Sequence, residues 1–323
     1  MASLLSVENL QVQFQTKKGI NTAVDGGSFS VEKGRILGIV GESGCGKSVT
    51  SMSILQLLGS NARISGGSIK LDGKELIGLP EKEMCRIRGN DIAMIFQDPM
   101  TALNPTLTIG TQLMEPIMLH QNCGKKEAWT RAVDVLKRVG IAAPEKRMKE
   151  YPHQLSGGMR QRVMIAMAVS CEPRLLIADE PTTALDVTIQ AQILELMCEL
   201  REKMGTAIML ITHDMGVVAE TADDVLVLYA GKAVEYGSIE DIFERPKHPY
   251  TQGLLNSIPR LDEDVELLNT IEGTVPAPDA MPAGCRFAPR CPYGKDRCMK
   301  EKPGVYHAGN SLVSCFRYEG EKE

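Results

Sequence analysis

The sequence predicts an α/β fold built around a mostly parallel sheet, and three observations support this prediction. Apolar strand patterns alternate with helical patterns along most of the chain. A glycine-rich loop joins the apolar run Ile36–Val40 to a helical segment. A second apolar run, Leu175–Ala178, ends on two adjacent carboxylates. Such alternation is typical of parallel sheets, whose ligands bind at the carboxyl ends of the strands.

The composition is that of an ordinary globular protein, and it argues against several functional classes. The 323 residues suggest about two domains. A net charge of −5 and an aromatic content of 4% predict neither a basic face nor base-stacking platforms, so we expect no nucleic-acid partner. No apolar run approaches the length that spans a bilayer, and the first residues lack the features of a signal peptide. We therefore expect a cytosolic chain.

The first 75 residues favour antiparallel strands around the α/β core. Leu10, Val12 and Phe14 alternate with glutamines, which is the period-two pattern of a half-buried strand. Further strands are expected from Phe29 and from Gly66, and the second of these ends in an Asp72-Gly73 turn.

The loop after Ile36–Val40 has the spacing Gly-x4-Gly-Lys-Ser of a phosphate loop. Its glycines allow backbone N–H groups to turn inward around an anion, and the helix expected over Val49–Leu58 adds the positive end of its dipole. Lys47 can neutralise the β- and γ-phosphates, and the Ser48 hydroxyl can ligate Mg²⁺. We therefore predict a nucleoside triphosphate site formed by Gly41, Glu42, Ser43, Gly44, Cys45, Gly46, Lys47, Ser48 and Val49.

Cys45 lies inside this loop, where inward-facing amides and a helix N-terminus favour the thiolate. We hypothesise that alkylation of Cys45 abolishes ATP binding and that MgATP protects the thiol. The alternative is a buried, inert small side chain.

Helical patterns dominate from the end of a short strand at Ile92–Phe96 to about Tyr151. The clearest helix covers Lys125–Val139, with one apolar face and Gly140 as its cap. The position of this region between two core strands predicts an inserted helical subdomain over about residues 98–165.

The next part of the chain returns to alternating strands and helices. The segment Ser156-Gly157-Gly158 precedes a helix at Arg160–Ser170, which is a phosphate-binding arrangement. Asp179 fits the acidic partner of the phosphate loop that holds Mg²⁺, and Glu180 beside it can polarise the attacking water. A helix over Thr188–Met204, a strand over Ala207–Ile211 that ends near His213, and a hairpin of Val225–Tyr229 with Ala233–Tyr236 follow.

Beyond Ser238 the alternation fades into a proline-rich appendix that holds four of the nine cysteines, with the spacing C-x5-C-x6-C-x16-C. In a reducing compartment such a group of cysteines favours a metal site over disulfides. The appendix has few residues for a hydrophobic core, so it would need a bound metal to stabilise its fold. These long loops do not match zinc knuckles and suit an iron–sulfur cluster on Cys285, Cys291, Cys298 and Cys315; zinc and unliganded thiols are the alternatives. Because the appendix is distant in sequence, we expect loss of a cysteine to leave nucleotide affinity intact.

Taken in order, the phosphate loop, Gln97, Leu155–Gly158, Leu175–Glu180, Leu185-Asp186 and His213 resemble the ATP-binding subunit of an ABC transporter. The resemblance covers about residues 4–240. It implies a P-loop ABC ATPase core with an N-terminal antiparallel β subdomain, within a nucleotide-binding domain at 1–240 and a C-terminal domain at 241–323.

The resemblance also implies a role for each matching residue. Phe14 would stack on adenine, unless it is only a core strand residue. Gln97 would ligate Mg²⁺ or orient water, and His213 would contact the γ-phosphate. Ser156, Gly157 and Gly158 would bind the γ-phosphate held by a second ATPase subunit, and Asp186 would bridge the two sites.

Phe96–Pro105, Leu155–Met164 and His248–Thr251, together with the cysteines, resemble the dipeptide/oligopeptide (and nickel) importer branch. Similar subunits carry [4Fe–4S]. The resemblance implies a peripheral subunit on the cytoplasmic face of the bacterial inner membrane. Its partners would be two permeases, an extracytoplasmic substrate-binding protein and a related, often different, ATPase subunit. Nickel, glutathione and other small solutes are alternative cargoes, and a soluble ABC ATPase of DNA repair or translation and a redox-sensing regulator are alternative functions.

Overall fold

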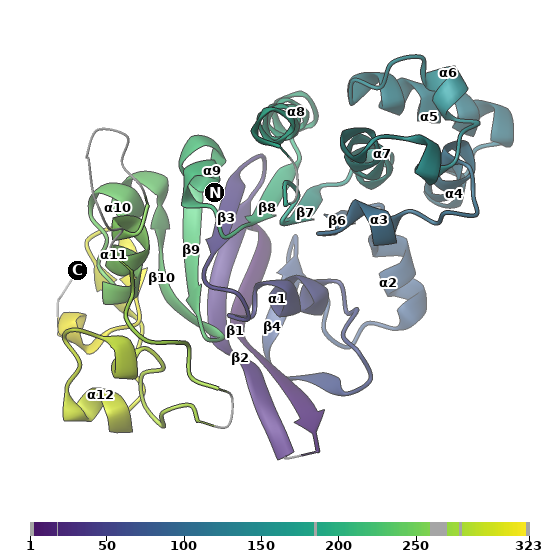
Figure 1. Cartoon of the computed structure of the whole chain (residues 1–323). Helices are drawn as coiled ribbons and strands as arrows, with labels where there is room; N and C mark the ends of the chain where they lie inside the picture. The colour runs from purple at the N-terminus through teal and green to yellow at the C-terminus, as the bar shows by residue number, and fades with distance from the viewer. Residues whose placement is uncertain (1–2, 18, 184–185, 259–269, 278–279, 321–323) are drawn as a thin grey trace. The chain divides into compact units, whose positions relative to one another are not determined.

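The computed structural model describes residues 3–17, 19–183, 186–258, 270–277 and 280–320. It divides into two compact units. The first unit comprises Val31–Arg35 and Gly78–Ile211, and the second comprises Ala2–Ser30, Ile36–Ile77 and Thr212–Glu323. Each unit is described by itself below (Figure 1).

An antiparallel sheet with the strand order β2-β1-β4-β5 forms the N-terminal part of the second unit. Its strands are β1 (Ser3–Thr16), β2 (Gly19–Glu32), β4 (Ala62–Leu71) and β5 (Lys74–Glu75). Leu10 and Val12 are buried, which confirms the half-buried strand. The positive φ angles of Asp72 (50°) and Gly73 (79°) confirm the tight turn.

Strands β2 and β4 begin earlier than the sequence predicted, at Gly19 and Ala62 in place of Phe29 and Gly66. The pairing of β1 with β4 extends to Phe14 opposite Ala62. The first residues of β4 alternate only between intermediate and exposed. Apolar alternation therefore marks only the part of a strand that covers the core.

The second unit also contains β3 (Ile36–Val40), β9 (Asp224–Tyr229) and β10 (Lys232–Ser238). β3 runs parallel to β9, and β9 forms an antiparallel hairpin with β10. The hairpin turns at Ala230 and Gly231, both with positive φ, as predicted. Two short strands near the C-terminus, β11 (Tyr306–Ala308) and β12 (Ser311–Val313), continue this sheet because β12 pairs with β10.

Short helices complete the second unit: α1 (Lys47–Ile54), α9 (Met215–Thr221), α10 (Ile239–Glu244), α11 (Pro249–Asn256), η2 (Ala288–Arg290), α12 (Asp296–Lys300) and η3 (Phe316–Tyr318). Helix α1 ends four residues before the predicted Leu58, because Gln56 takes a positive φ of 49° that the α-helix does not allow. The appendix is thus more regular than its many prolines suggested. The domain boundary at residue 240 stays a prediction.

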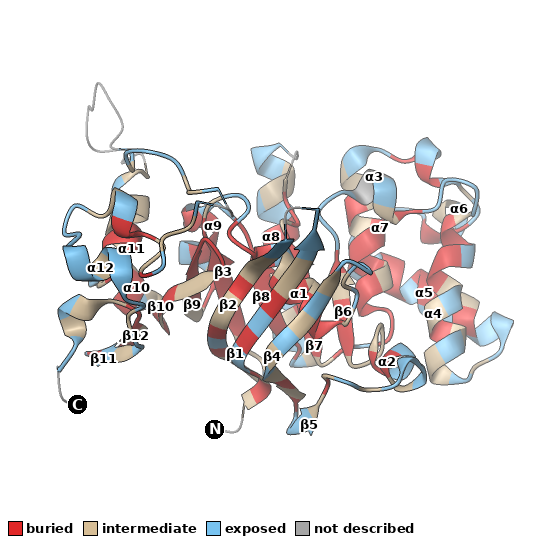
Figure 2. Ribbon diagram, turned by 90° about the horizontal axis from the view of Figure 1, so that it is seen from below, coloured by how far each residue is buried: buried red, intermediate tan, exposed pale blue. Residues whose placement is uncertain are grey.

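Three parallel strands form the centre of the first unit: β6 (Ile92–Ile95), β7 (Leu175–Asp179) and β8 (Ala207–Ile211). Every residue of β7 and β8 is buried, as the red ribbons of Figure 2 show. This burial explains why these strands are continuous apolar runs, as is typical of parallel sheets.

The helices of the first unit are α2 (Glu81–Ile87), α3 (Pro99–Ala102), α4 (Ile109–Gln121), α5 (Lys125–Arg138), α6 (Pro144–Arg147), η1 (Pro152–Gln154), α7 (Gly157–Val169) and α8 (Val187–Met204). Helix α5 buries Ala128, Ala132 and Leu136, and Gly140 follows it with a φ of 74°. Both features confirm the predicted helix and its cap. In the part of the chain that the structure describes, no helix is long and apolar enough to span a membrane.

Candidate nucleotide site

The phosphate loop connects β3 to α1 in the second unit, and its conformation depends on glycine. Gly41 has a φ of 152° and Gly46, which precedes the helix, has a φ of 97°. A Cβ atom on Gly41 would overlap the carbonyl oxygen of Leu228 and lie 2.7 Å from the Cys45 Sγ atom. A larger residue at position 41 would therefore combine backbone strain with a steric clash.

Lys47 points back into this loop from the first turn of α1. Its Nζ atom donates hydrogen bonds to the carbonyl oxygens of Gly41, at 2.7 Å, and of Glu42, at 3.2 Å. The side chain is buried, whereas Ser43, Gly44 and Ser48 are exposed. The ammonium group is therefore held inside the loop while the outer face of the loop remains accessible to a ligand.

Cys45 differs from the prediction of a reactive thiol. It is only 1% exposed, and burial raises the pKa of its thiol although the Lys47 ammonium lies 3.9 Å from the sulfur. Desolvation thus outweighs the nearby positive charges, since it disfavours the charged thiolate. The expectation that the loop favours the thiolate is wrong, and the structure supports the alternative of a buried packing residue.

The two acidic residues predicted from the sequence, Asp179 and Glu180, lie in the first unit, at the carboxyl end of β7. Asp179 is the buried last residue of the strand, and Glu180 follows with a positive φ of 47°. The Glu180 Oε2 atom accepts hydrogen bonds from Gln97 Nε2 at 2.8 Å and from Thr183 Oγ1 at 2.9 Å. The structure therefore brings together Gln97 and Glu180, as expected for residues that act on one water. Thr183 was missed, because no motif singles out a threonine in this loop.

Ser156 and Asp186 both cap helices of the first unit. The Ser156 hydroxyl accepts a hydrogen bond from the Met159 N–H at the start of α7, and the Asp186 carboxylate accepts one from the Ile189 N–H at the start of α8. A Cβ atom on Gly157 would meet no other atom within 4 Å. Gly158 is half-buried, with Ile189 3.4 Å from the position of its missing Cβ. Local capping accounts for the Ser156 and Asp186 contacts, so their predicted roles toward a second subunit stay predictions; Leu185 lies outside the described residues.

The remaining predicted residues belong to the second unit. Phe14 is half-buried on β1, and His213 is exposed directly after the buried Thr212. Exposure of the imidazole is compatible with a contact to a phosphate. Their roles toward adenine and the γ-phosphate are not tested by these positions and stay predictions.

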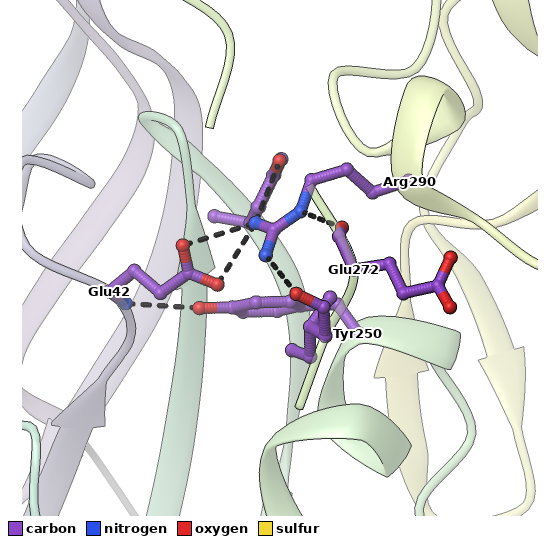
Figure 3. A network of polar contacts seen from close by, with 6 residues as sticks. Glu42, Tyr250, Glu272 and Arg290 are labelled. Carbon is purple, nitrogen blue, oxygen red and sulfur yellow. Dashed lines mark hydrogen bonds and ion pairs between the residues drawn. The ribbon is translucent and has the colours of Figure 1, made fainter. Parts of the chain in front are cut away.

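The C-terminal appendix contacts the phosphate loop at Glu42, which sequence reasoning did not foresee. The Tyr250 hydroxyl accepts a hydrogen bond from the Glu42 N–H at 3.0 Å. The Arg290 Nη1 atom lies 3.0 and 3.1 Å from the two Glu42 carboxylate oxygens (Figure 3). Distance in sequence therefore does not separate the appendix from the phosphate loop, because chain folding returns residues 208 and 248 positions away to it. That loss of a cysteine leaves nucleotide affinity intact stays a prediction.

A second ion-pair group fixes the appendix to β2. Arg286 lies 3.2 Å from the Asp25 carboxylate and also donates a hydrogen bond to the Ala230 carbonyl oxygen. Lys302 contacts the same carboxylate at 2.7 Å. The neighbouring Gly231 N–H donates to the Cys45 carbonyl oxygen at 2.8 Å. The loop is thus held from two sides within the second unit.

The four clustered cysteines, Cys285, Cys291, Cys298 and Cys315, line one cavity of about 70 Å³. Burial, followed by the neighbouring thiols, raises the pKa of Cys285 to about 11. Among the described residues, however, no three His, Cys, Asp or Glu side chains form a group that could hold a metal ion. The predicted iron–sulfur cluster is therefore not confirmed. The fold brings the four cysteines to one cavity, as their spacing in the sequence suggested. The spacing does not determine where each Sγ atom points.

Comparison with known proteins identifies the family. Residues 24–183 match the ABC transporter family, and residues 234–298 match the C-terminal region of oligopeptide/dipeptide transporters. The oligopeptide transport ATP-binding protein AppD of Bacillus subtilis is 56% identical over 99% of this chain and 98% of its own length. The OppD protein of Escherichia coli, with the same description, is 52% identical over 98% of this chain and 93% of its own length.

Solved structures agree with this assignment. The dimeric ABC cassette MJ0796, bound to ADP and phosphate, is 27% identical, with a TM-score of 0.66 over 73% of this chain and 98% of its own. The cbiO1 protein of Clostridium perfringens is 28% identical, with a TM-score of 0.65 over 76% of this chain and 92% of its own. The chain therefore belongs to the ATPase subunits of ABC transporters, in the family of oligopeptide and dipeptide transport ATP-binding proteins.

Proposed function

We propose that this chain is the ATP-hydrolysing motor of a bacterial importer of dipeptides or oligopeptides. The observation that carries the proposal is the match over nearly the whole length to peptide transport ATP-binding proteins, including a separate match of the appendix. The ABC core alone supports only a transport ATPase, and the appendix supports the peptide branch. Nickel, glutathione and other small solutes remain the alternative cargoes.

In the proposed ATP site, the phosphate loop holds the β- and γ-phosphates through its backbone N–H groups and Lys47. Phe14 stacks on the adenine, and His213 contacts the γ-phosphate. Ser48, Asp179 and Gln97 supply oxygen ligands, which Mg²⁺ prefers. When bound, this Mg²⁺ neutralises charge that develops on the transferred phosphoryl group.

Glu180 is the proposed general base. The Gln97 amide and the Thr183 hydroxyl both donate to Oε2, which fixes the plane of the carboxylate. An oriented carboxylate can accept a proton from the attacking water as the water approaches the γ-phosphate. Ser156, Gly157 and Gly158 would act on the nucleotide of a second ATPase subunit, with Asp186 between the two sites.

The four-cysteine cavity is proposed to bind a [4Fe–4S] cluster. With their side chains turned toward one another, the four thiols that line this cavity would form a complete donor set for such a cluster or for zinc. Lys295 and Arg317 line the same cavity, and their charges suit an anionic thiolate group. The raised pKa values of Cys285, Cys291 and Cys315, caused first by burial, mean that binding must displace protons. The bound group would tie together segments that are far apart in the appendix.

The proposed assembly places this subunit on the cytoplasmic face of the inner membrane. Two permeases, an extracytoplasmic binding protein and a second, related ATPase subunit complete it. The test is co-expression with candidate permeases and a binding protein from the same organism, followed by reconstitution in vesicles. We expect ATP-dependent uptake of labelled peptides that Lys47→Ala abolishes. Uptake of chelated nickel or glutathione without peptide uptake would assign another cargo, and no uptake of any solute by an active ATPase would refute the importer.

A further inference from the structure

We propose that Arg290 is a positioning residue for ATP binding, which holds the phosphate loop in shape through Glu42. The inference rests on the proposed function in one respect, namely that nucleotide binds at the loop. It adds that a side chain of the appendix, 248 residues further along the chain, sets the affinity of that site.

The guanidinium of Arg290 is almost enclosed, with 6% of the side chain exposed. Besides the two Glu42 oxygens, it donates to the carbonyl oxygens of Ile271, at 3.1 Å, and Glu272, at 2.9 Å, and Nη1 lies 3.4 Å from the Tyr229 hydroxyl. These groups converge on one cation in Figure 3. Because these contacts hold it on several sides, Arg290 is a rigid support for Glu42. An exposed arginine would instead lose conformational entropy when it formed the same ion pair.

Tyr250 holds the main chain of the same loop residue. Its ring is fully buried against Tyr229, with 4.6 Å between ring centroids, and against Phe287, at 5.4 Å. Its hydroxyl accepts the Glu42 N–H bond. Both the backbone and the carboxylate of Glu42 are therefore fixed by groups from the second half of the chain.

Lys47 connects the contact between Arg290 and Glu42 to the proposed nucleotide site. The Glu42 carbonyl oxygen accepts a hydrogen bond from Lys47 Nζ at 3.2 Å, and Glu42 directly follows Gly41, whose φ of 152° other residues rarely adopt. A shift of Glu42 must therefore move the ammonium group or the inward-facing backbone of the loop. Because affinity for phosphate depends on both, freeing Glu42 should weaken ATP binding.

Arg297 provides a matched control in the same appendix. It forms ion pairs with Glu301 and Glu319, and its guanidinium lies over the Phe316 ring, but its side chain is 46% exposed. The described partners of Arg297 all belong to the appendix. A general effect of losing an arginine there should therefore appear in Arg297→Gln as well as in Arg290→Gln.

The experiment compares wild type, Arg290→Gln, Arg297→Gln, Glu42→Gln and the Arg290→Gln/Glu42→Gln double variant in the assembled transporter. We expect Arg290→Gln to weaken MgATP binding and raise KM for ATP about tenfold, within the usual range of coupling between sites. We expect kcat to change by less than about twofold, because Glu180 and Gln97 are untouched. The double variant should bind MgATP no more weakly than the weaker-binding of the two single variants, because each single substitution already removes the same Arg290–Glu42 interaction. Arg297→Gln should match wild type.

Hydrogen exchange without nucleotide gives a readout that does not depend on activity. Peptides covering residues 41–47 should exchange faster in Arg290→Gln and at the wild-type rate in Arg297→Gln. If Arg290→Gln fails to assemble, Tyr250→Phe takes its place, because it deletes one hydroxyl and keeps the ring. It should raise both the exchange rate and the KM for ATP.

The outcomes separate the two proposals. If wild type binds no MgATP, or Lys47→Ala binds it equally well, the assignment of the nucleotide site fails. If wild type binds and Lys47→Ala does not, an Arg290→Gln variant with wild-type affinity and exchange overturns the positioning role alone. Equal losses of MgATP affinity in Arg290→Gln and Arg297→Gln also overturn the positioning role, because they indicate a general effect of losing an arginine from the appendix.

Discussion

Protonation of His248 should destabilise the fold as the pH falls below about 6.5. The imidazole is 1% exposed, and burial together with the charge of Arg317 lowers its pKa from 6.5 to about 3. Its Nδ1 atom accepts the Tyr250 N–H at 3.1 Å and so caps helix α11. A proton on Nδ1 would therefore place a charge in a buried site near the charge of Arg317 and remove the cap at the same time.

The sign and size follow from linkage between folding and proton binding. Below pH 6.5 the unfolded chain binds a proton at His248 that the folded chain does not, so the free energy of unfolding falls as the pH falls. Each pH unit contributes about 1.4 kcal/mol. Relative to pH 8, the loss at pH 5 is about 2 kcal/mol, and most of it occurs below pH 6.5. Well above pH 6.5 this contribution is constant.

The assay is urea unfolding of wild type and His248→Asn at several pH values between 8 and 5. Asparagine can still accept the N-cap hydrogen bond but does not titrate, so the stability of the variant should fall less steeply below pH 6.5. His307→Gln, at an exposed position of the same unit, is the control for the loss of a histidine. Parallel curves for wild type and His248→Asn would refute the reasoning, because all other groups are shared.

Further predictions concern the catalytic and cysteine residues. Glu180→Gln should keep ATP binding but slow hydrolysis by about 10²–10⁴-fold, and near-normal steady-state turnover would reject Glu180 as the base. Cys45, buried and with a raised thiol pKa, should resist alkylation in the folded chain with or without MgATP; fast labelling seen by mass spectrometry would contradict its burial. Protein purified without oxygen should contain iron and acid-labile sulfide that Cys285→Ser and Cys315→Ser lose, whereas zinc without sulfide would favour the zinc alternative.

Much of the nucleotide site could be predicted from the sequence because its chemistry is local. The glycine spacing of the loop reflects backbone angles, and Gly41 and Gly46 adopt the positive φ values that only glycine takes readily. The apolar run before Asp179 forms a fully buried strand. The same unbroken series of apolar side chains made the strand recognisable in the sequence. Where the physical cause lies within a few residues, the pattern in the sequence is sufficient.

Predictions failed where distant residues decide the outcome. Cys45 was expected to be a thiolate from its immediate neighbours, but burial under the loop controls its pKa. Arg290 and Tyr250 lie on no motif that points to Glu42, and the contact exists only because the chain returns to β3 through β9 and the appendix. The positions of the four thiols depend on side-chain orientation, which spacing does not encode.

The motif does not specify which residues occupy positions 42–45 of the phosphate loop. These residues therefore show how the loop is fixed in this particular chain. In Gly-x4-Gly-Lys-Ser, phosphate chemistry dictates the glycines, the lysine and the serine, whereas residues 42–45 vary. Two of these four, Ser43 and Gly44, are exposed, and the other two face the rest of the second unit. Cys45 is buried beneath the loop, and Glu42 contacts Arg290 and Tyr250. The motif thus supplies the general affinity for phosphate, and one of its variable positions, Glu42, connects the loop to the appendix.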